Sequence, residues 1–208
     1  MNPKNLEKIL NAIENFDEFF GEKYVAPEYI QAWELNKKHG ITLNPLPPKS
    51  REFICNLITE KKPKVILEIG TGAGGTTICI AEKASFYGGE ITTFERSAPK
   101  AEIARVHIKI SGLQNILLFE KDAMEVINSW NKPIDLLFLD ADRKHYLDFF
   151  MILEKHFQEN CIILADNVLN YKRDVINFIN HIASDSHYDS SILPIDNGLL
   201  YASKKNRL

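Results

Sequence analysis

Short apolar runs alternate with longer amphipathic segments from residue 64 onward. The runs are too short for helices and have the length of buried strands: 65–69, 91–94, 116–119, 134–139 and 161–165. The segments between them repeat apolar residues at helical spacing: 76–85, 99–111, 123–130, 145–157 and 171–184. Strands that alternate with helices predict an α/β fold, a doubly wound and mainly parallel sheet with both faces covered.

The C-terminal end departs from this alternation. Segments 191–195 and 199–202 are separated only by Asp196-Asn197-Gly198, a turn that suits a β-hairpin because Asn and Gly tolerate positive φ. We therefore expect an antiparallel pair of strands to close the sheet.

The N-terminal end reads as helical. Apolar residues recur at helical spacing and predict an amphipathic first helix; they are Leu6, Ile9, Leu10, Ile13, Phe16, Phe19 and Phe20. Further helices are expected over 27–38 and 49–60, on either side of a proline-rich break. Residues 1–62 are thus expected to form a helical extension that packs on a domain of residues 63–208, within one structural domain. The apolar face of the first helix has two interpretations: it packs on its own core, or it forms a lid or a homodimer surface.

Composition and charge limit the possible partners. The chain has 208 residues, 45% of them apolar, and 25 Lys plus Arg against 28 Asp plus Glu, a net charge of −3. This balance is ordinary for a globular protein and gives no support to nucleic acid as the main partner. Cys55, Cys79 and Cys161 form no C-x-x-C pair, which favours reduced thiols, and no apolar run is long enough to cross a membrane. We expect a cytoplasmic protein.

A glycine-rich segment follows the first predicted strand. Gly70, Gly72 and Gly75 fit the pattern G-x-G-x-x-G, which brings a ligand against bare backbone where a helix begins. Glu95 ends the second strand, where a carboxylate accepts hydrogen bonds from ribose hydroxyls. Together these features predict a nucleoside cofactor.

The residue two positions before this segment bears on which cofactor it is. Glu68 would repel a pyrophosphate but could accept from the ammonium of an amino acid, which favours S-adenosylmethionine over NAD. Asp122, followed by Ala123, comes directly after the third strand. Its carboxylate suits either an adenine amino group or the N-cap of the next helix, and the two roles are compatible.

Oxygen ligands follow the next two strands. Asp140 ends the fourth strand, and Asp166 and Asn167 end the fifth. Because the carboxyl ends of neighbouring strands share one crevice, these side chains are expected to converge there. Hard oxygen donors suit Mg²⁺, or another divalent cation such as Mn²⁺, better than zinc. The alternative is that these acids cap the following helices or stay solvated.

These motifs together resemble the cation-dependent class I O-methyltransferases, the family of catechol and caffeoyl-CoA O-methyltransferases. The resemblance runs from about Val65 to the C-terminus, through the segments 67–74, 121–123, 139–142, 165–169 and 193–199. It implies a metal site at Asp140, Asp166 and Asn167. The S-adenosylmethionine site that it implies, extended by neighbouring residues of the same segments, comprises Glu68, Gly70, Thr71, Gly72, Thr76, Glu95, Asp122, Ala123 and Asp140.

Two departures from the family pattern affect the chemistry. Relatives have a lysine after the Asp-Ala-Asp segment, whereas this chain has Arg143 followed by Lys144. Arginine stays protonated and cannot act as a general base. Either Lys144 reaches the site, or Arg143 only stabilises negative charge there while a metal bound at Asp140 lowers the pKa of the acceptor hydroxyl. The second departure is segment 46–50, which replaces the part of relatives that helps cover the cofactor.

The function expected from these features is methyl transfer from S-adenosylmethionine to a hydroxyl of a small acceptor, best a vicinal dihydroxy aromatic compound. One alternative is a tRNA-modifying methyltransferase on the same scaffold, which would need a basic surface. The other is an NAD-dependent oxidoreductase, which would leave Asp140 and Asp166 without a role.

Overall fold

A seven-stranded sheet forms the centre of the molecule. The computed structural model describes residues 3–14, 27–40, 43 and 45–206. The strand order in the sheet is β3-β2-β1-β4-β5-β7-β6. The strands are β1 (Val65–Ile69), β2 (Glu90–Phe94), β3 (Ile116–Phe119), β4 (Ile134–Leu139), β5 (Phe157–Ala165), β6 (Tyr188–Leu193) and β7 (Leu199–Lys204).

The first five strands run parallel and the last two form an antiparallel hairpin. β1 pairs with β2 and β4, β5 continues the parallel sheet, and β7 lies antiparallel between β5 and β6. The predicted doubly wound sheet closed by an antiparallel pair is confirmed. The expected strand 191–195 is shifted, because β6 ends at Leu193, which pairs with Leu199. Pro194 has no N–H to donate to the ladder, so the strand stops before it.

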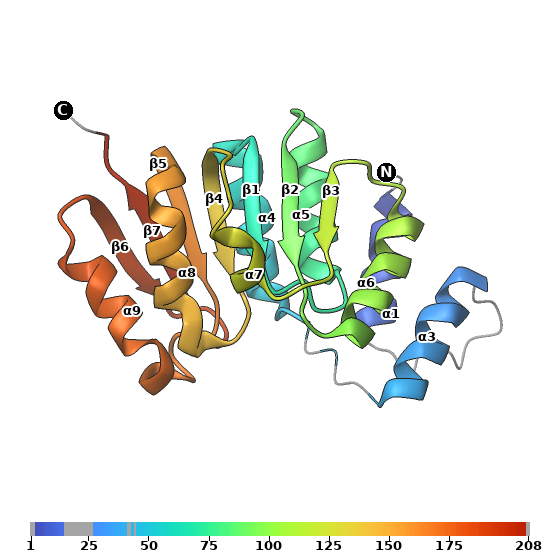
Figure 1. Cartoon of the computed structure of the whole chain (residues 1–208). Coiled ribbons are helices and arrows are strands. Elements are labelled where there is room, and N and C mark those ends of the chain that lie inside the picture. Colours follow the sequence, from blue (N-terminus) through green and yellow to red (C-terminus); the bar gives the residue numbers. More distant parts are fainter. Residues whose placement is uncertain (1–2, 15–26, 41–42, 44, 207–208) are drawn as a thin grey trace.

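Helices cover both faces of the sheet. α7, α8 and α9 lie on the face in front in Figure 1, and α4 and α5 lie behind it. The helices are α1 (Pro3–Glu14), α3 (Pro27–His39), α4 (Pro48–Lys61), α5 (Gly75–Ser85), α6 (Ala98–Ser111), α7 (Ala123–Ile127), α8 (Tyr146–Leu153) and α9 (Lys172–Ser184), with 3₁₀ turns at Arg143–His145 and Glu154–His156. Among the described residues, no helix is long and apolar enough to span a membrane.

Two predicted helices are shorter in the structure. The segment expected to be helical over 145–157 becomes α8 between two 3₁₀ turns, and Phe157 already pairs with Ile134 in the sheet. The Phe157 ring packs edge-on against Phe150 of α8, which ties the end of this helix to the start of β5. The helix expected over 123–130 ends at Ile127.

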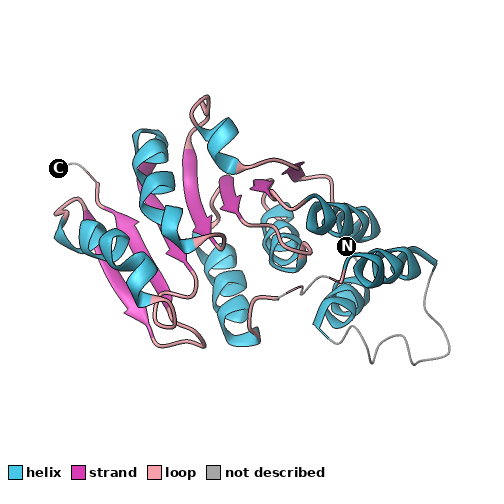
Figure 2. Ribbon diagram, turned by 60° about the horizontal axis from the view of Figure 1, so that its bottom comes forward, coloured by secondary structure: helices cyan, strands magenta, loops and turns pink. Residues whose placement is uncertain are grey.

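Helices α1 and α3 lie at the end of the sheet opposite the hairpin. Figure 2 shows this end beside the N-terminus. Ile9 and Ile13 of α1 are buried in one cluster with Ile78 of α5 and Ile103 of α6. In the described part of α1, therefore, the apolar face packs on the protein's own core. Phe16, Phe19 and Phe20 lie outside the described residues, and the division at residue 62 stays a prediction.

Candidate active site

A large cavity lies where five strands end. Its volume is about 960 Å³, within the roughly 300–1,000 Å³ typical of ligand sites. The chain segments that follow β1, β2, β3, β4 and β5 all contribute to its wall. The crevice expected at the carboxyl ends of the strands is therefore present. Ile13 of α1, Leu43 and the segment 45–47 close its other side, so the segment in which this chain departs from the family pattern lines the cavity.

The glycine-rich segment is held tightly between two strand ends. Gly70 has φ +109°, and a Cβ added there would lie 2.0 Å from the backbone oxygen of Asp140. The backbone N–H groups of Gly70 and Thr71 both donate to the carbonyl of Phe94, at 3.0 and 3.1 Å. This packing leaves bare backbone on the cavity wall immediately before α5 begins, as the sequence pattern predicts.

Glu68 lies beneath this segment. Its side chain is fully buried, and its Oε2 accepts hydrogen bonds from the hydroxyls of Thr77 and Thr93, the latter at 2.6 Å. Burial raises the pKa of Glu68 to about 7. Its Oε1 is buried and has no hydrogen-bond partner among the described residues. Glu68 is not among the residues that line the cavity, so the structure separates it from the other predicted cofactor residues.

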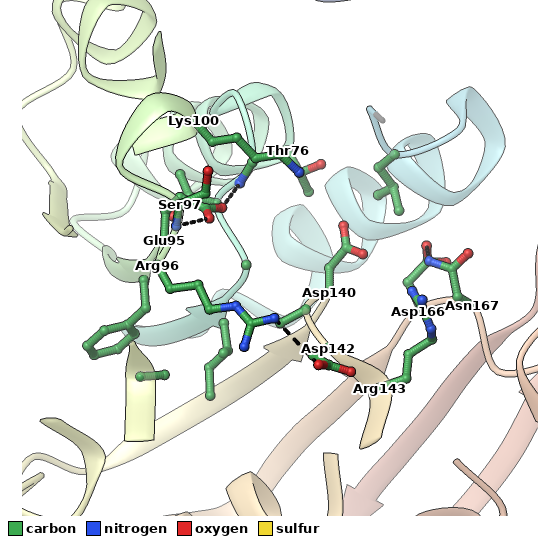
Figure 3. Close-up of a pocket in the computed structure, with 18 of the residues that line it drawn as sticks. Thr76, Glu95, Arg96, Ser97, Lys100, Asp140, Asp142, Arg143, Asp166 and Asn167 are labelled. Atoms are coloured by element: carbon green, nitrogen blue, oxygen red, sulfur yellow. Dashed lines mark hydrogen bonds and ion pairs between the residues drawn. The ribbon is translucent and has the colours of Figure 1, made fainter. Parts of the chain in front are cut away.

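Glu95 is fixed on the cavity wall by two backbone groups. Its Oε2 accepts from the N–H of Gly72 and its Oε1 from the N–H of Ser97, both at 2.8 Å (Figure 3). Each carboxylate oxygen keeps a second lone pair. Glu95 can therefore receive two hydroxyl donors from a ligand without losing the contacts that hold it.

Asp122 acts as the N-cap of α7. Its Oδ1 accepts from the N–H of Met124 at 3.0 Å, and its Oδ2 lies 3.9 Å from Arg96 Nη1. Arg96 also reaches Asp142 at 3.4 Å (Figure 3). The capping role considered for Asp122 is thus realised, and its position in the cavity wall beside Ala123 leaves it accessible to a ligand. Thr76, at the start of α5, lies in the same wall.

Asp140, Asp166 and Asn167 meet at one side of the cavity (Figure 3). Asn167 has φ +65°, and its amide donates to Asp166 Oδ2 at 2.6 Å. Asp166 Oδ1 is buried, and no residue in the described part of the chain forms a hydrogen bond with it. Burial and the charges of Asp166 and Glu68 raise the pKa of Asp140 to about 8. Burial likewise raises the pKa of Asp166 to about 6.

This cluster fits a divalent cation. The negative charge of Asp166 disfavours ionisation of Asp140, and Asp166 also has a buried oxygen that no described residue pairs. A bound cation would stabilise both carboxylates in their charged form. Within the described ranges, no three His, Cys, Asp or Glu side chains are placed to hold a metal. The predicted ligand set therefore depends on the amide oxygen of Asn167 as its third member.

The two basic candidates have different surroundings. Arg143 lines the cavity, and its guanidinium lies 3.7 Å from the centre of the Tyr171 ring. Its positive charge opposes the upward pKa shifts of Asp140 and Asp166. Lys144 is exposed and is absent from the cavity wall; its backbone N–H donates to Asp142 Oδ1 at 3.4 Å. The structure thus brings Arg143, but not Lys144, to the acidic cluster.

Two contributors were not singled out from the sequence. Ser97 holds Glu95 through its backbone, and His107 of α6, fully buried, places Nδ1 2.8 Å from the carbonyl oxygen of Ala73 in the glycine-rich segment. The nearness of Ser97 to Glu95 in the chain could have revealed the first. No sequence signal marks His107, because its contact depends on how α6 packs beneath the segment.

Comparisons with known proteins point to one family. A model of a family described as O-methyltransferase matches residues 31–205. The O-methyltransferase ankF of Aspergillus thermomutatus is 30% identical over 128 residues, 59% of this chain and 53% of that protein. A catechol O-methyltransferase of Mycobacterium tuberculosis is 28% identical over 120 residues, 57% of this chain and 54% of that protein. The chain thus spans about half the length of these curated relatives.

A solved structure agrees in fold. The O-methyltransferase from Bacillus cereus in complex with SAH superposes with a TM-score of 0.76 at 22% identity, covering 94% of this chain and 100% of that one. The resemblance drawn from the sequence motifs is confirmed. Since the family model covers most of the sequence, the chain belongs to the O-methyltransferase family.

Proposed function

We propose that this protein transfers a methyl group from S-adenosylmethionine to a hydroxyl oxygen of a small acceptor, with the help of a divalent cation such as Mg²⁺ or Mn²⁺. The observation that carries the proposal is that one cavity contains both the glycine-rich segment with Glu95 and the acidic cluster of Asp140, Asp166 and Asn167. Both reactants would then be held in one enclosed space, which is what group transfer between them requires.

The cofactor would lie along the wall formed after β1, β2 and β3. Glu95 would accept from the two ribose hydroxyls, and Asp122 and Ala123 would meet the adenine. Backbone of the segment 70–72 and the side chain of Thr76 would border the amino acid moiety. Glu68 would support the segment from below, through its hydrogen bonds with the hydroxyls of Thr77 and Thr93. The complex of the Bacillus cereus relative with SAH, the product form of this cofactor, supports the choice of cofactor.

The cation would be held by Asp140, Asp166 and Asn167. A bound divalent cation lowers the pKa of a coordinated hydroxyl, so that the nucleophilic oxyanion is available near neutral pH. Arg143, which is stacked on Tyr171, would add positive charge beside the reacting oxygen without exchanging a proton. In this proposal Lys144 has no part in the chemistry.

The acceptor would be a vicinal dihydroxy aromatic compound. Two adjacent hydroxyls suit a site that offers a cation between two strand ends, and the Phe149 and Tyr171 side chains give the cavity aromatic surface nearby. The names of the curated catechol O-methyltransferases point to the same class. Arg143 and Lys100 also line this cavity and would tolerate an acidic substituent on the ring.

Two other functions are less well supported. A tRNA acceptor would need a basic surface, but Lys204 donates to the carbonyl of Phe157 and Lys205 pairs with Asp189, so these two lysines already have protein partners. An NAD-dependent oxidoreductase would leave the acidic cluster unused. The predicted homodimer and cytoplasmic location stay predictions, and light scattering of the purified protein would test the first.

Labelled S-adenosylmethionine and a panel of acceptors test the proposal directly. A dihydroxyphenol should be methylated, the activity should disappear in EDTA and return with Mg²⁺, and Asp166→Ala should behave like the chelated protein. Asp189→Ala, a change at an exposed position of β6, is the matched control and should keep full activity. Undiminished turnover in EDTA would refute the metal role, and methylation of unmodified tRNA alone would refute the acceptor class.

Calorimetry tests the cofactor independently of turnover. S-adenosylhomocysteine should bind to the protein without added metal, and NAD should not. Glu95→Gln should weaken this binding, because a neutral amide accepts hydrogen bonds more weakly than a carboxylate and has only one acceptor oxygen. Equal binding of NAD and S-adenosylhomocysteine would argue for a different nucleoside chemistry.

A further inference from the structure

A half-buried lysine in the first turn of α6 lines the cavity. Lys100 is the third residue of this helix, which starts directly after Ser97. The backbone N–H of Ser97 is one of the two groups that fix Glu95 on the cavity wall. Figure 3 shows Lys100 on the same side of the cavity as Glu95 and Thr76. The lysine therefore belongs to the part of the wall that the cofactor would occupy.

The packing of α6 against the glycine-rich segment sets the direction of Lys100. Ala104 follows Lys100 by about one helical turn, so the two residues lie on the same face of α6. A Cβ added at Gly74, the N-cap of α5, would lie 3.5 Å from the Cα of Ala104. The face of α6 that carries Lys100 thus contacts the glycine-rich segment where α5 begins. Lys100 lies one turn nearer the start of α6, where it reaches the cavity.

The ammonium of Lys100 differs from two other cations of the wall in having no local partner. Arg96 lies 3.9 and 3.4 Å from two carboxylates, and Arg143 is stacked on Tyr171. In the part of the chain that the structure describes, no residue forms an ion pair or a hydrogen bond with the Lys100 side chain. Burial raises the pKa of Asp140, and the positive charge of Lys100 is among those that oppose this rise. A half-buried ammonium without a partner suits an anionic group of a ligand.

S-adenosylmethionine has one anionic group, the carboxylate of its amino acid moiety, besides a cationic ammonium and a cationic sulfonium. We propose that Lys100 binds this carboxylate through a charge-assisted hydrogen bond. The inference rests on the proposed cofactor, whose amino acid moiety would lie beside the segment 70–72 and Thr76. The contact between α6 and Gly74 places Lys100 over this part of the wall.

The bond would position the cofactor and take no part in the transfer itself. The carboxylate keeps its charge from the bound cofactor through the transition state, so the bond stabilises both equally. Loss of the Lys100 ammonium should therefore raise the KM for S-adenosylmethionine about tenfold and leave kcat within about twofold.

Two ligands that differ only in the carboxylate test the proposal. S-adenosylhomocysteine carries it, and decarboxylated S-adenosylhomocysteine keeps the nucleoside, the thioether and the ammonium. In calorimetry, Lys100→Met should weaken binding of S-adenosylhomocysteine about tenfold, the loss expected for one hydrogen bond between charged groups. The same variant should bind the decarboxylated ligand within about twofold of the wild-type affinity, because that ligand has no group for Lys100 to bind.

Two further variants separate charge from packing. Lys100→Arg keeps the positive charge and should retain most of the affinity for S-adenosylhomocysteine. The matched control is Lys109→Met, the same substitution at an exposed position in the last turn of α6, which should bind both ligands like the wild-type protein. Added salt should narrow the difference between wild type and Lys100→Met, because it screens the charge pair. Circular dichroism confirms that each variant is folded.

Three results would overturn the inference. Equal weakening of both ligands by Lys100→Met would mean that the lysine only supports the shape of the wall. Unchanged binding of S-adenosylhomocysteine would leave its carboxylate to other groups. A loss confined to the KM for a dihydroxybenzoate would assign Lys100 to an acidic group of the acceptor. In each of these cases the wild-type protein still binds S-adenosylhomocysteine, whereas a wild-type protein that does not bind it would refute the proposed cofactor itself.

Discussion

His107 connects α6 to the glycine-rich segment through one buried hydrogen bond. A neutral ring with its proton on Nδ1 donates to the carbonyl of Ala73, while Nε2 is buried without a partner. Protonation of Nε2 would place a charge with no partner in the core, and burial accordingly lowers the pKa of His107. At pH values at which the ring is protonated in the unfolded chain, it is therefore expected to stay neutral in the folded protein.

This difference makes stability depend on pH. Below the ordinary histidine pKa the unfolded chain binds a proton that the folded chain does not, so the free energy of unfolding falls as pH falls through about 6.5. His107→Asn keeps an N–H donor near the same place and removes the titration. Relative to the variant, the wild-type protein should lose stability between about pH 7.5 and pH 5.5, by at most about 1.4 kcal/mol for this one proton.

Urea unfolding at several pH values measures this difference. Glu68, Asp140 and Asp166 have raised pKa values and titrate in the same range with the opposite sign, but both proteins contain them, so their effect cancels in the comparison. Parallel curves for wild type and His107→Asn would mean that His107 titrates normally in the folded state.

Arg143 and Lys144 are adjacent in sequence but differ in their expected contribution to turnover. Arg143→Ala should lower kcat by roughly 10²-fold, the loss typical of one electrostatic group at a reacting oxygen, and Arg143→Lys should recover part of it. Lys144→Ala should leave kcat within about twofold, because the side chain is exposed and outside the cavity wall. Initial rates across pH measure both, and a larger loss for Lys144→Ala would assign the proton transfer to Lys144.

At the scale of elements, the connection between β1 and α5 has little room for change. Gly70 combines φ +109° with a close approach to the Asp140 backbone, so Gly70→Ala forces two strand ends apart. Gly112, the C-cap of α6, has φ +69° but open space around it. Gly112→Ala should cost about 1 kcal/mol from the unfavourable backbone conformation alone. Gly70→Ala should cost more than about 3 kcal/mol, since a buried clash is added.

Chemical denaturation compares the two glycine variants directly. S-adenosylhomocysteine binding should be lost in Gly70→Ala and kept in Gly112→Ala, because only Gly70 lies in the cavity wall. Equal losses of stability would show that backbone conformation, and not the approach to Asp140, makes Gly70 necessary.

The sequence predicts elements well where the local pattern and the tertiary contacts agree. β1, β3 and β4 have their predicted bounds and β2 begins one residue early, because each is a short and mostly apolar run. β5 begins at Phe157, four residues before its predicted segment, because the polar and exposed residues 158–160 do not resemble a buried strand. The predicted position of β6 is wrong by two to three residues, because β6 is an edge strand whose residues 189–191 are polar and exposed and do not resemble a strand. α8 is shorter than its pattern because Phe157 is recruited by Ile134 across the sheet, a contact far away in sequence.

The candidate site follows the same rule. Residues that end strands could be placed from the sequence, because parallel strands bring their carboxyl ends to one edge, and Glu95, Asp140, Asp166 and Asn167 indeed share the cavity. The sequence could not show which of these side chains reach the cavity surface and which are buried beneath it. Glu68 lies one layer below the cavity surface because its neighbours Thr77 and Thr93 supply the hydrogen bonds that bury it.

At the scale of the whole molecule, a hydrogen-bonded contact joins the start of α4 to the turn of the C-terminal hairpin. Ser50, in the first turn of α4, donates to Asp196 Oδ2 through both its N–H and its hydroxyl, at 2.8 and 2.9 Å. Pro47, the N-cap of α4, forms no side-chain cap. Asp196, 146 residues away, therefore caps the helix in its place and adds a favourable negative charge at the helix N-terminus. Pro47 and Asn197, on the two sides of this contact, both line the cavity.

Breaking this contact should loosen the cavity more than the core. Asp196→Gly removes both hydrogen bonds and tolerates the φ of +48° found there, so the expected loss of stability is only about 1 kcal/mol. The KM for the acceptor should rise more than kcat falls, because the wall moves while the acidic cluster stays in place. Ser50→Ala should cost less than Asp196→Gly, since the backbone donor remains, and should cost almost nothing when added to Asp196→Gly. Denaturation and steady-state kinetics of the two single variants and the double variant form a complete cycle. Strictly additive losses would show that Ser50 and Asp196 act independently and that α4 is held at the hairpin by other contacts.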